Sequence, residues 1–257
     1  MSISKQQVRQ RFSRAKDSYM QHATAQDEIC AHLAGLIQSY VGKVKVLPQL
    51  FEVGCGSGML THRLLDGLNI DRYIVNDIYP EIESFFRNIP HIELCIGDAE
   101  TIAFPKENNA IVSSSALQWM HDLPQFFQKI HESLEAQGWF IFSIFGPENL
   151  KEIKSLTGQG LAYSSSDYLK QQLIQHGFDV LHIEENKIVL DFLKPLSVLK
   201  HLKATGVTAN TNGFAWTKNT LKKFDSDYTE QFSYNGADDL KYYPLTYHPI
   251  YIVARRV

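Results

Sequence analysis

The chain has 257 residues, of which 44% are hydrophobic and 21% are charged, as is usual for a globular protein with a sizeable core. A net charge of −3 gives no global basic field, which argues against nucleic-acid binding. No run of about 18 apolar residues occurs, so no membrane-spanning helix is expected. The three cysteines, Cys30, Cys55 and Cys95, form neither a disulfide framework nor a CxxC metal site. Residues 1–14 lack an apolar signal core, and we therefore expect a cytoplasmic protein.

Strands and helices are expected to alternate along most of the chain. Apolar residues recur every three or four positions over residues 27–40, which predicts a helix with one buried face. Short apolar runs that end in Gly, Asp or Asn predict buried strands between further helices. In chain order the expected elements are helix 27–40, strand 50–53, helix 60–68, strand 73–75, helix 82–89, strand 92–96, strand 110–112, helix 123–134, strand 139–144, helix 167–176, strand material within 178–193 and strand 247–255. This order predicts an α/β fold with a doubly wound, mostly parallel sheet of seven strands.

Residues 194–241 interrupt this alternation. Leu196, Leu199 and Leu202 have helical spacing, but no clear strand follows them. We expect a helical and loop insert before the last strand, packed over the carboxyl edge of the sheet, where ligands bind in open α/β folds. The whole chain, residues 1–257, is otherwise expected to form a single domain.

A glycine-rich loop lies between an expected strand and an expected helix. Its sequence, Glu52-Val53-Gly54-Cys55-Gly56-Ser57-Gly58, places glycines where the backbone turns tightly and approaches a ligand closely. The loop resembles motif I of class I methyltransferases, an acidic residue followed by GxGxG. A dinucleotide-binding GxGxxG loop is the competing interpretation, but it requires glycine at position 59, where this chain has Met59.

Acidic residues end three successive expected strands: Glu52, Asp77 and Asp98. Each carboxylate alone could be an ordinary turn or cap residue, but turns do not explain all three. A carboxylate at Asp77 can accept hydrogen bonds from both ribose hydroxyls of an adenosyl group. The three together predict a binding site for an adenosyl cofactor.

The resemblance to methyltransferases assigns further positions. In that fold the acid at Asp98 takes the adenine amino group, and the next backbone N–H, that of Ala99, meets a ring nitrogen. Glu52 faces the positive amino-acid end of the cofactor, and the residues after the fourth strand lie where the methyl group is presented. The implied cofactor is S-adenosylmethionine, with the binding residues Glu52, Gly54, Cys55, Gly56, Gly58, Asp77, Ile78, Asp98, Ala99, Ser114 and Ser115.

Four further segments match one family, in order along the chain. They are Phe12-Ser13-Arg14-Ala15 with Tyr19, His22-Ala23 and Gln26; Ala116-Leu117-Gln118-Trp119; residues 199–206; and residues 243–248. By these motifs the chain resembles the malonyl-[acyl-carrier protein] O-methyltransferases of biotin synthesis. The resemblance implies a Rossmann-like class I fold and methylation of the free carboxylate of a malonyl thioester. The chain departs from the family pattern at Met20, Ser115, Gln137 and residues 161–164, so no substrate contact is carried over from the last segment.

The implied substrate needs little help from acid–base chemistry. A carboxylate is already ionised at pH 7 and is its own nucleophile, so no general base is required. The expected task of the protein is alignment for in-line attack and exclusion of water. We expect neither a catalytic triad nor a metal, since the ten histidines show no ligand spacing. His121 is the one possible catalytic histidine, and a surface position at a helix start explains it at least as well.

Tyr19 and Gln26 are spaced to share one face of a helix. The resemblance makes residues 1–45 an N-terminal helical lid in which both side chains cover the cofactor. A packing tyrosine and a solvated glutamine are the alternative.

Six lysines and no acidic residue lie between Lys194 and Lys223. Lys200 and Lys203 lie three positions apart on the expected helix. Acyl-carrier proteins are strongly acidic, so this region suits the docking of one, with Tyr247 as a further substrate residue. A solvated lysine face is the alternative.

Other functions remain open. A small-molecule carboxyl or carbon methyltransferase would keep the fold with a different substrate, and a non-catalytic scaffold would bind the cofactor without turnover. A nicotinamide dehydrogenase is disfavoured by Met59. A monomer is favoured, although the sequence does not reveal the oligomeric state.

Overall fold

The computed structural model describes residue 5 and residues 23–206 and 216–257. Residues 1–4 and 6–22 of the expected lid, Tyr19 among them, and residues 207–215 lie outside the described residues. The chain forms two compact units. The large unit contains Gln26–Phe145, Ser164–Glu185 and Pro249–Val257; the small unit contains Gly146–Tyr163 and Asn186–His248, with the described residues up to Ala25. No helix in the described part is long and apolar enough to cross a bilayer.

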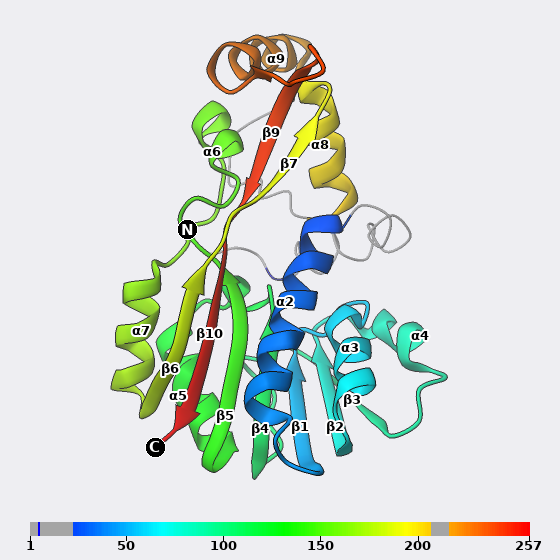
Figure 1. Cartoon of the computed structure of the whole chain (residues 1–257), viewed down its shortest axis with the longest axis vertical. Helices are drawn as coiled ribbons and strands as arrows, with labels where there is room; N and C mark the ends of the chain where they lie inside the picture. The colour runs from blue at the N-terminus through cyan, green and yellow to red at the C-terminus, as the bar shows by residue number, and fades with distance from the viewer. Residues whose placement is uncertain (1–4, 6–22, 207–215) are drawn as a thin grey trace. The chain divides into compact units, whose positions relative to one another are not determined.

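The large unit is built on a seven-stranded sheet with the order β3-β2-β1-β4-β5-β10-β6 (Figure 1). Its strands are β1 (Leu47–Val53), β2 (Ile70–Asp77), β3 (Ile92–Ile96), β4 (Asn108–Ser114), β5 (Leu134–Phe145), β6 (Phe178–Glu185) and β10 (Pro249–Arg256). The strands from β3 to β5 pair in parallel, and β10 runs antiparallel to both β5 and β6. The expected doubly wound, mostly parallel sheet is therefore confirmed.

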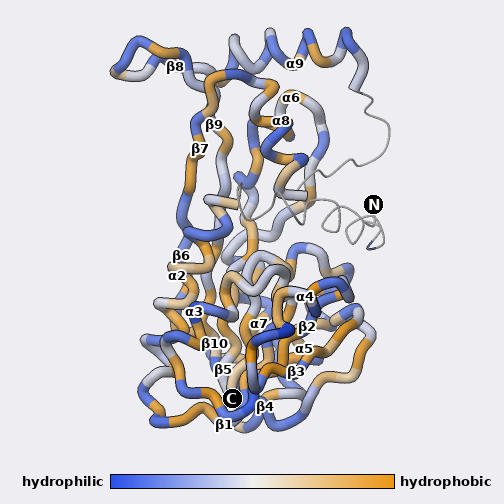
Figure 2. The backbone as a smooth tube through the Cα atoms, turned by 90° about the vertical axis from the view of Figure 1, so that its right-hand side faces the viewer, coloured by the Kyte–Doolittle hydropathy of each residue, from blue (hydrophilic) through white to orange (hydrophobic). Residues whose placement is uncertain are grey.

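Helices cover both faces of this sheet (Figures 1 and 2). The helix α2 (Thr24–Val41), which belongs to the large unit from Gln26 on, lies with α3 (Met59–Gly67) on one face. The opposite face carries α5 (Leu123–Ser133) and α7 (Ser166–Gln175). Short helical segments follow β2 and β4: η1 (Pro80–Ile82), α4 (Glu83–Phe86) and η2 (Leu117–Trp119). Because side chains alternate along a strand, Glu52 of β1 points toward α3, whereas its neighbours Phe51 and Val53 point toward α5.

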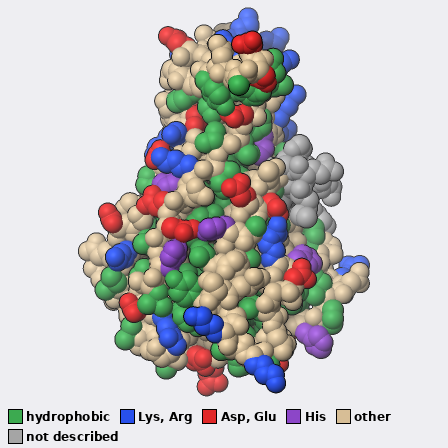
Figure 3. Space-filling model, in the orientation of Figure 1, with side chains coloured by type: hydrophobic (Ala, Val, Ile, Leu, Met, Phe, Trp, Pro, Cys, Tyr) green, Lys and Arg blue, Asp and Glu red, His purple; other side chains and the backbone are tan. Residues whose placement is uncertain are grey.

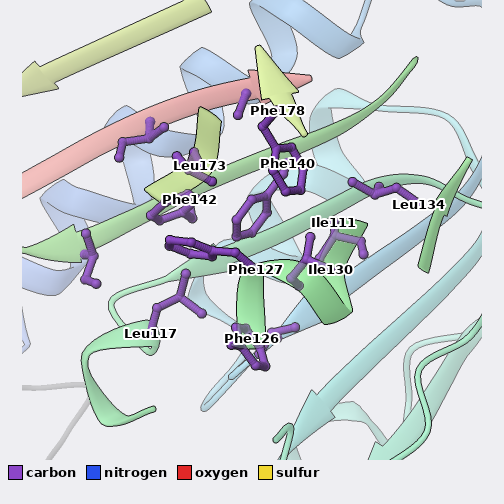
Figure 4. Close-up of a cluster of buried hydrophobic side chains, with 14 of the residues drawn as sticks. Ile111, Leu117, Phe126, Phe127, Ile130, Leu134, Phe140, Phe142, Leu173 and Phe178 are labelled. Atoms are coloured by element: carbon purple, nitrogen blue, oxygen red, sulfur yellow. The ribbon is translucent and has the colours of Figure 1, made fainter. Parts of the chain in front are cut away.

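Aromatic side chains fill the space between the sheet, α5 and α7 (Figure 4). The ring of Phe127 lies 5.9 Å from that of Phe140 and 6.1 Å from that of Phe142. Each fully buried side chain of this size contributes about 1.5–3 kcal/mol of hydrophobic stabilisation. This packing fixes the positions of the strands, and so of the loops at their carboxyl ends.

The small unit combines a three-stranded sheet with three helices. The strands are β7 (Ile188–Phe192), β8 (Tyr234–Asn235) and β9 (Lys241–Tyr247), and β9 pairs antiparallel with both others. The helices are α6 (Lys151–Thr157), α8 (Pro195–Ala204) and α9 (Lys218–Gln231). Tyr228 of α9 donates a 2.6 Å hydrogen bond to the carbonyl oxygen of Pro244. Glu152 of α6 is buried and accepts a 3.1 Å hydrogen bond from the backbone N–H of Thr246.

Two segments that were each expected to form strand are divided between the two sheets in the structure. The strand expected over residues 247–255 is divided at His248, because Tyr247 pairs with Ile188 of β7, whereas Pro249 pairs with Phe145 of β5. The strand material expected within residues 178–193 divides in the same way into β6 and β7. The range 194–241 contains α8 and α9, as its helical spacing predicts, together with the two-residue strand β8, which was not expected.

Candidate active site

The loop between β1 and α3 is shaped by its glycines. Gly54, Gly56 and Gly58 have φ angles of 72°, 53° and 83°, a left-handed conformation that favours glycine. A Cβ atom at Gly54 would lie 2.3 Å from the Cβ atom of Ala116, so this glycine also allows a close approach to the segment after β4. A Cβ atom at Gly56 would meet nothing within 4 Å, which leaves open space beside the backbone at the centre of the loop.

The loop is tied to the end of β2. The backbone N–H groups of Gly54 and Cys55 both donate to the carbonyl oxygen of Asn76, at 2.8 and 2.9 Å. Asp77 Oδ2 accepts a 2.9 Å hydrogen bond from the N–H of Gly56, and its Oδ1 accepts one from Tyr79 at 3.0 Å. Burial raises the pKa of Asp77 above its usual range, and these backbone donors oppose that shift.

Asp77 is therefore part of the frame of the loop. Each of its carboxylate oxygens retains a second lone pair for a ligand. Ile78, which follows it, is half-buried, whereas Cys55 is buried and its thiol pKa is raised well above the usual value by that burial.

Glu52 lies inside the protein on the α2 and α3 face of the sheet. Its side chain is only 1% exposed. One carboxylate oxygen, Oε2, accepts hydrogen bonds from Thr61 Oγ1 at 2.7 Å and from the hydroxyl of Tyr73 at 2.5 Å. Burial raises the pKa of Glu52 to about 7, and the nearby carboxylate of Asp77 adds to this rise.

The turn after β3 is held to the segment before α5. Asp98 Oδ1 accepts a 3.0 Å hydrogen bond from the N–H of Glu100, and Ala99 between them is buried. Glu100 Oε1 accepts hydrogen bonds from the backbone N–H groups of His121 and Asp122, at 2.9 and 3.0 Å. The exposed imidazole of His121 has its Nδ1 atom 3.4 Å from the other oxygen of Glu100. The geometry thus gives His121 a surface position near the start of α5, and its catalytic role stays a hypothesis.

Ser114 and Ser115 end β4 beside a serine of β5. Ser115 has a φ of 51°, and its N–H donates to both the carbonyl and the hydroxyl oxygen of Ser143, at 3.0 and 3.1 Å. Ser114 Oγ lies 3.2 Å from Ser143 Oγ and 3.3 Å from the Sγ atom of Cys30 on α2. A left-handed residue other than glycine costs on the order of 1–3 kcal/mol and is common at binding sites.

Four buried polar atoms have no hydrogen-bond partner within the described part of the chain: Gln26 Oε1, Ser57 Oγ, Ser115 Oγ and Gln118 Oε1. Buried polar groups in folded proteins are almost always hydrogen-bonded. Ser57 belongs to the glycine loop, and Ser115 and Gln118 follow β4, so three of these atoms come from loops at the carboxyl ends of neighbouring strands. Together with the open space at Gly56, they fit a polar ligand that the protein itself does not supply.

Sequence reasoning missed the supporting residues. The loop and its carboxylates depend on Thr61, Tyr73, Asn76 and Ser143, none of which forms a motif. The only available signal was the placement of polar residues in otherwise apolar strands, such as Ser143 within the apolar run 139–144. Among the residues that the structure describes, no cluster of His, Cys, Asp and Glu could hold a metal ion.

The remaining expected residues lie in the small unit or at its boundary. Lys200 and Lys203 are exposed on α8, whereas Tyr247 is fully buried and its hydroxyl lies 2.8 Å from Nε2 of His201. Gln26 of α2 is buried. Tyr19 is outside the described residues, so the expected lid remains an expectation.

Comparison with known proteins first defines the class. The family model described as "Methyltransferase domain" matches residues 51–142, which include the glycine loop, Asp77 and Asp98. A solved structure of a putative methyltransferase from Bacillus halodurans C-125 superposes with a TM-score of 0.63 and 14% identity, over 88% of this chain and 98% of that one. The N-methyltransferase NodS from Bradyrhizobium japonicum WM9, solved with S-adenosyl-L-homocysteine, gives a TM-score of 0.52 at 11% identity, over 88% and 86% of the two chains. The fold and the matched domain are those of a methyltransferase.

Sequence relatives then define the family. The chain is 44% identical to "Malonyl-[acyl-carrier protein] O-methyltransferase" of Acinetobacter baylyi, over 100% of this chain and 98% of the relative. It is 35% identical to the protein of the same name from Haemophilus influenzae, over 99% of this chain and 95% of the relative. The chain belongs to the malonyl-[acyl-carrier protein] O-methyltransferase family.

Proposed function

We propose that this protein transfers a methyl group from S-adenosylmethionine to the free carboxylate of malonyl-acyl-carrier protein, an early step in biotin synthesis. The observation that carries the proposal is 44% identity to a malonyl-[acyl-carrier protein] O-methyltransferase along the whole chain. The family's domain model and fold agree with S-adenosylmethionine as the cofactor. The glycine loop and the three carboxylates are intact in the structure.

The cofactor site is assigned to the loops after β1, β2, β3 and β4. When bound, S-adenosylmethionine supplies an electrophilic methyl group on a sulfonium centre. Asp77 accepts from the ribose hydroxyls, since each of its oxygens can accept beyond its backbone donor. Asp98 and the N–H of Ala99 recognise the adenine, and Glu52 is the counter-ion to the amino-acid end. The glycine loop, Ser114 and Ser115 would line the cofactor site, and Gln26 and Tyr19 would belong to the lid.

No residue of this chain needs to remove a proton from the substrate. A malonyl carboxylate is ionised at pH 7, so it attacks directly. The protein accelerates the reaction by holding the nucleophile in line and by excluding water, because opposite charges neutralise as the bond forms. His121, exposed beside Glu100, is not required as a base.

The acyl-carrier protein is assigned to the lysine-bearing face of the small unit, formed by α8 and α9. Figure 3 shows basic side chains along this edge. The lysines of the region are Lys194, Lys200, Lys203, Lys218, Lys222 and Lys223, all of them exposed. Only Lys223 forms an ion pair among the interactions of the described residues, with Asp227 at 2.7 Å. Five cations thus remain for an acidic partner.

The test is a direct assay with the full-length protein. Methyl-labelled S-adenosylmethionine is incubated with malonyl-acyl-carrier protein, and the product is examined for a methyl ester on the malonyl group. Acetyl-acyl-carrier protein, which has no free carboxylate, should stay unlabelled. Labelling of free small acids but not of the carrier-bound substrate would indicate a small-molecule methyltransferase, and cofactor binding without any turnover would indicate a scaffold.

A further inference from the structure

The buried carboxylate of Glu52 accepts hydrogen bonds from described residues on only one of its two oxygens. Both hydrogen bonds to it from described residues go to one oxygen, Oε2, and come from hydroxyl groups that are themselves buried. Thr61 donates from α3 and Tyr73 from β2, so two separate elements fix the same atom. No described residue donates a hydrogen bond to the other oxygen, Oε1. A carboxylate can accept about four hydrogen bonds, so the free oxygen keeps its full capacity.

The described groups that face Glu52 offer it no positive charge. They are the carboxylate of Asp77 and the hydroxyl of Tyr73 on β2, the thiol of Cys55 in the glycine loop and the thiol of Cys30 on α2. None of these groups is basic, and the guanidinium of Arg63 on α3, which acts on the thiol of Cys30, forms an ion pair with Asp27 of α2 at 2.7 Å. An ionised carboxylate with 1% exposure and no cation is costly, and the two hydroxyl donors offset only part of that cost. A cationic ligand at Oε1 would complete the arrangement.

We propose that Tyr73, supported by Thr61, is a positioning residue for the cofactor, which holds Glu52 Oε2 so that Oε1 is presented to the ammonium group of S-adenosylmethionine. This inference rests on the proposed function, because it takes the cofactor as the source of the cation. Tyr73 is 1% exposed and donates its hydroxyl hydrogen bond to Glu52, so it acts through that carboxylate.

A consequence of this arrangement is that cofactor binding and ionisation of Glu52 are coupled. The cation favours the ionised carboxylate, so binding releases a proton from Glu52 at pH values where the free protein still carries it. Affinity should rise as pH increases through the range in which Glu52 ionises. Loss of the Tyr73 hydroxyl removes a donor that favours the ionised form, which moves this range to higher pH.

Tyr73→Phe tests the proposal by calorimetric titration of the full chain with S-adenosylmethionine between pH 6 and pH 8.5. We expect the dissociation constant at pH 7 to rise about tenfold, and the pH midpoint of affinity to move upward by about one unit, as for loss of one charge-assisted hydrogen bond. Tyr228→Phe is the matched control. It also removes a buried tyrosine hydroxyl with one hydrogen bond, to Pro244 in the small unit, and should change neither quantity.

A double variant distinguishes a positioning role of the Tyr73 hydroxyl from a role in packing alone. In Glu52→Ala protein the further change Tyr73→Phe should leave affinity unchanged, because the side chain through which the hydroxyl acts is absent. If Tyr73→Phe protein does not fold, Thr61→Val removes the other donor to the same oxygen and should shift the midpoint in the same direction. An unshifted midpoint in a folded variant, or an equal loss of affinity in the Glu52→Ala background, would overturn the proposal. Failure of the unmodified protein to bind S-adenosylmethionine would instead overturn the proposed function.

Discussion

At the residue scale, Asp77 holds the glycine loop and has a second, proposed role in binding the cofactor. It accepts one hydrogen bond from the glycine loop and one from the turn that follows β2, so it organises the loop before any ligand binds. In the proposed function, its remaining lone pairs accept from the ribose hydroxyls. A substitution at this position therefore affects both the ligand contact and the shape of the loop.

Asp77→Ala should weaken binding of S-adenosylmethionine by roughly 2–4 kcal/mol, because two hydroxyls lose a charged acceptor and the N–H of Gly56 loses its partner. Asp77→Asn keeps one acceptor oxygen and should lose less. Calorimetry on both variants measures the difference, with circular dichroism to verify the fold. An unchanged dissociation constant in Asp77→Ala protein would show that Asp77 serves only the turn.

The sequence indicated the residues that belong to motifs, but it did not indicate the residues that hold them by hydrogen bonds. Glu52, Asp77 and Asp98 are conspicuous in the sequence because each lies at or near the end of a strand pattern. The donors to Glu52 could not be predicted, because Tyr73 reaches it only through the pairing of β1 with β2, and Thr61 only through the packing of α3 on that strand. Strand register and helix packing decide such contacts, and neither is readable from one sequence.

At the scale of elements, α8 presents a mixed stripe to solvent. Val198, His201 and Leu202 are buried, whereas Leu196, Lys200 and Lys203 are exposed. The exposed three lie at positions i, i+4 and i+7 of the helix, so they share one face. On this exposed face Leu196 lies near the start of the helix, and the two lysines follow toward its end. The buried residues of α8 hold the helix in place.

Reversing both charges, Lys200→Glu with Lys203→Glu, should raise the apparent KM for malonyl-acyl-carrier protein and weaken its dependence on salt. The contacts are exposed charges, which salt screens over about 10 Å at 0.1 M. Affinity for S-adenosylmethionine should stay nearly unchanged, because the assigned cofactor residues from Glu52 to Asp98 are in the large unit. Steady-state kinetics at two salt concentrations provides the measurement.

The control for this charge reversal is Lys43→Glu with Lys45→Glu, two exposed lysines of the large unit. A short malonyl thioester without phosphate is the reference substrate, since the phosphates of coenzyme A could use the same lysines. Equal slowing of the short substrate would place Lys200 and Lys203 in the active site or in the fold. No effect on either substrate would make the lysines a solvated face.

The predicted boundaries of strands were wrong where one continuous run of β-forming residues pairs with two different sheets. Residues 247–255 are rich in β-formers, which predicts one strand over this range, but nothing in the composition marks His248 as the change of partner. The N–H of His248 donates to Asn149 at 3.2 Å, and its carbonyl accepts from Gly146 at 2.7 Å. The break is therefore decided by contacts about a hundred residues away in sequence, and not by local propensity.

At the scale of the whole molecule, the fold buries an ionisable side chain, that of Glu52, near the carboxyl end of β1. Most of the core of the large unit is apolar, yet Glu52 is buried in it with hydroxyl partners alone among the described residues. Such a group costs folding free energy in the absence of a ligand and regains it when a cation binds. The stability of the free protein should therefore depend on the same carboxylate that is proposed to bind the cofactor.

The pH dependence of unfolding tests this link. The pKa of Glu52 is raised from 4.5 to about 7 in the folded protein, so between these values the folded state holds a proton that the unfolded state has lost. The free energy of unfolding from this group is thus fully present below pH 4.5 and falls by about 3 kcal/mol as pH rises to about 7. Glu52→Gln cannot ionise, so its stability relative to the unmodified protein should increase over the same window.

The control is Glu230→Gln, a change at an exposed carboxylate of the small unit, which should not reproduce this trend. Denaturant titrations at pH 5 and pH 8 measure both differences, and a parallel pH dependence of Glu52→Gln and unmodified protein would show that Glu52 is ionised in the free protein without cost.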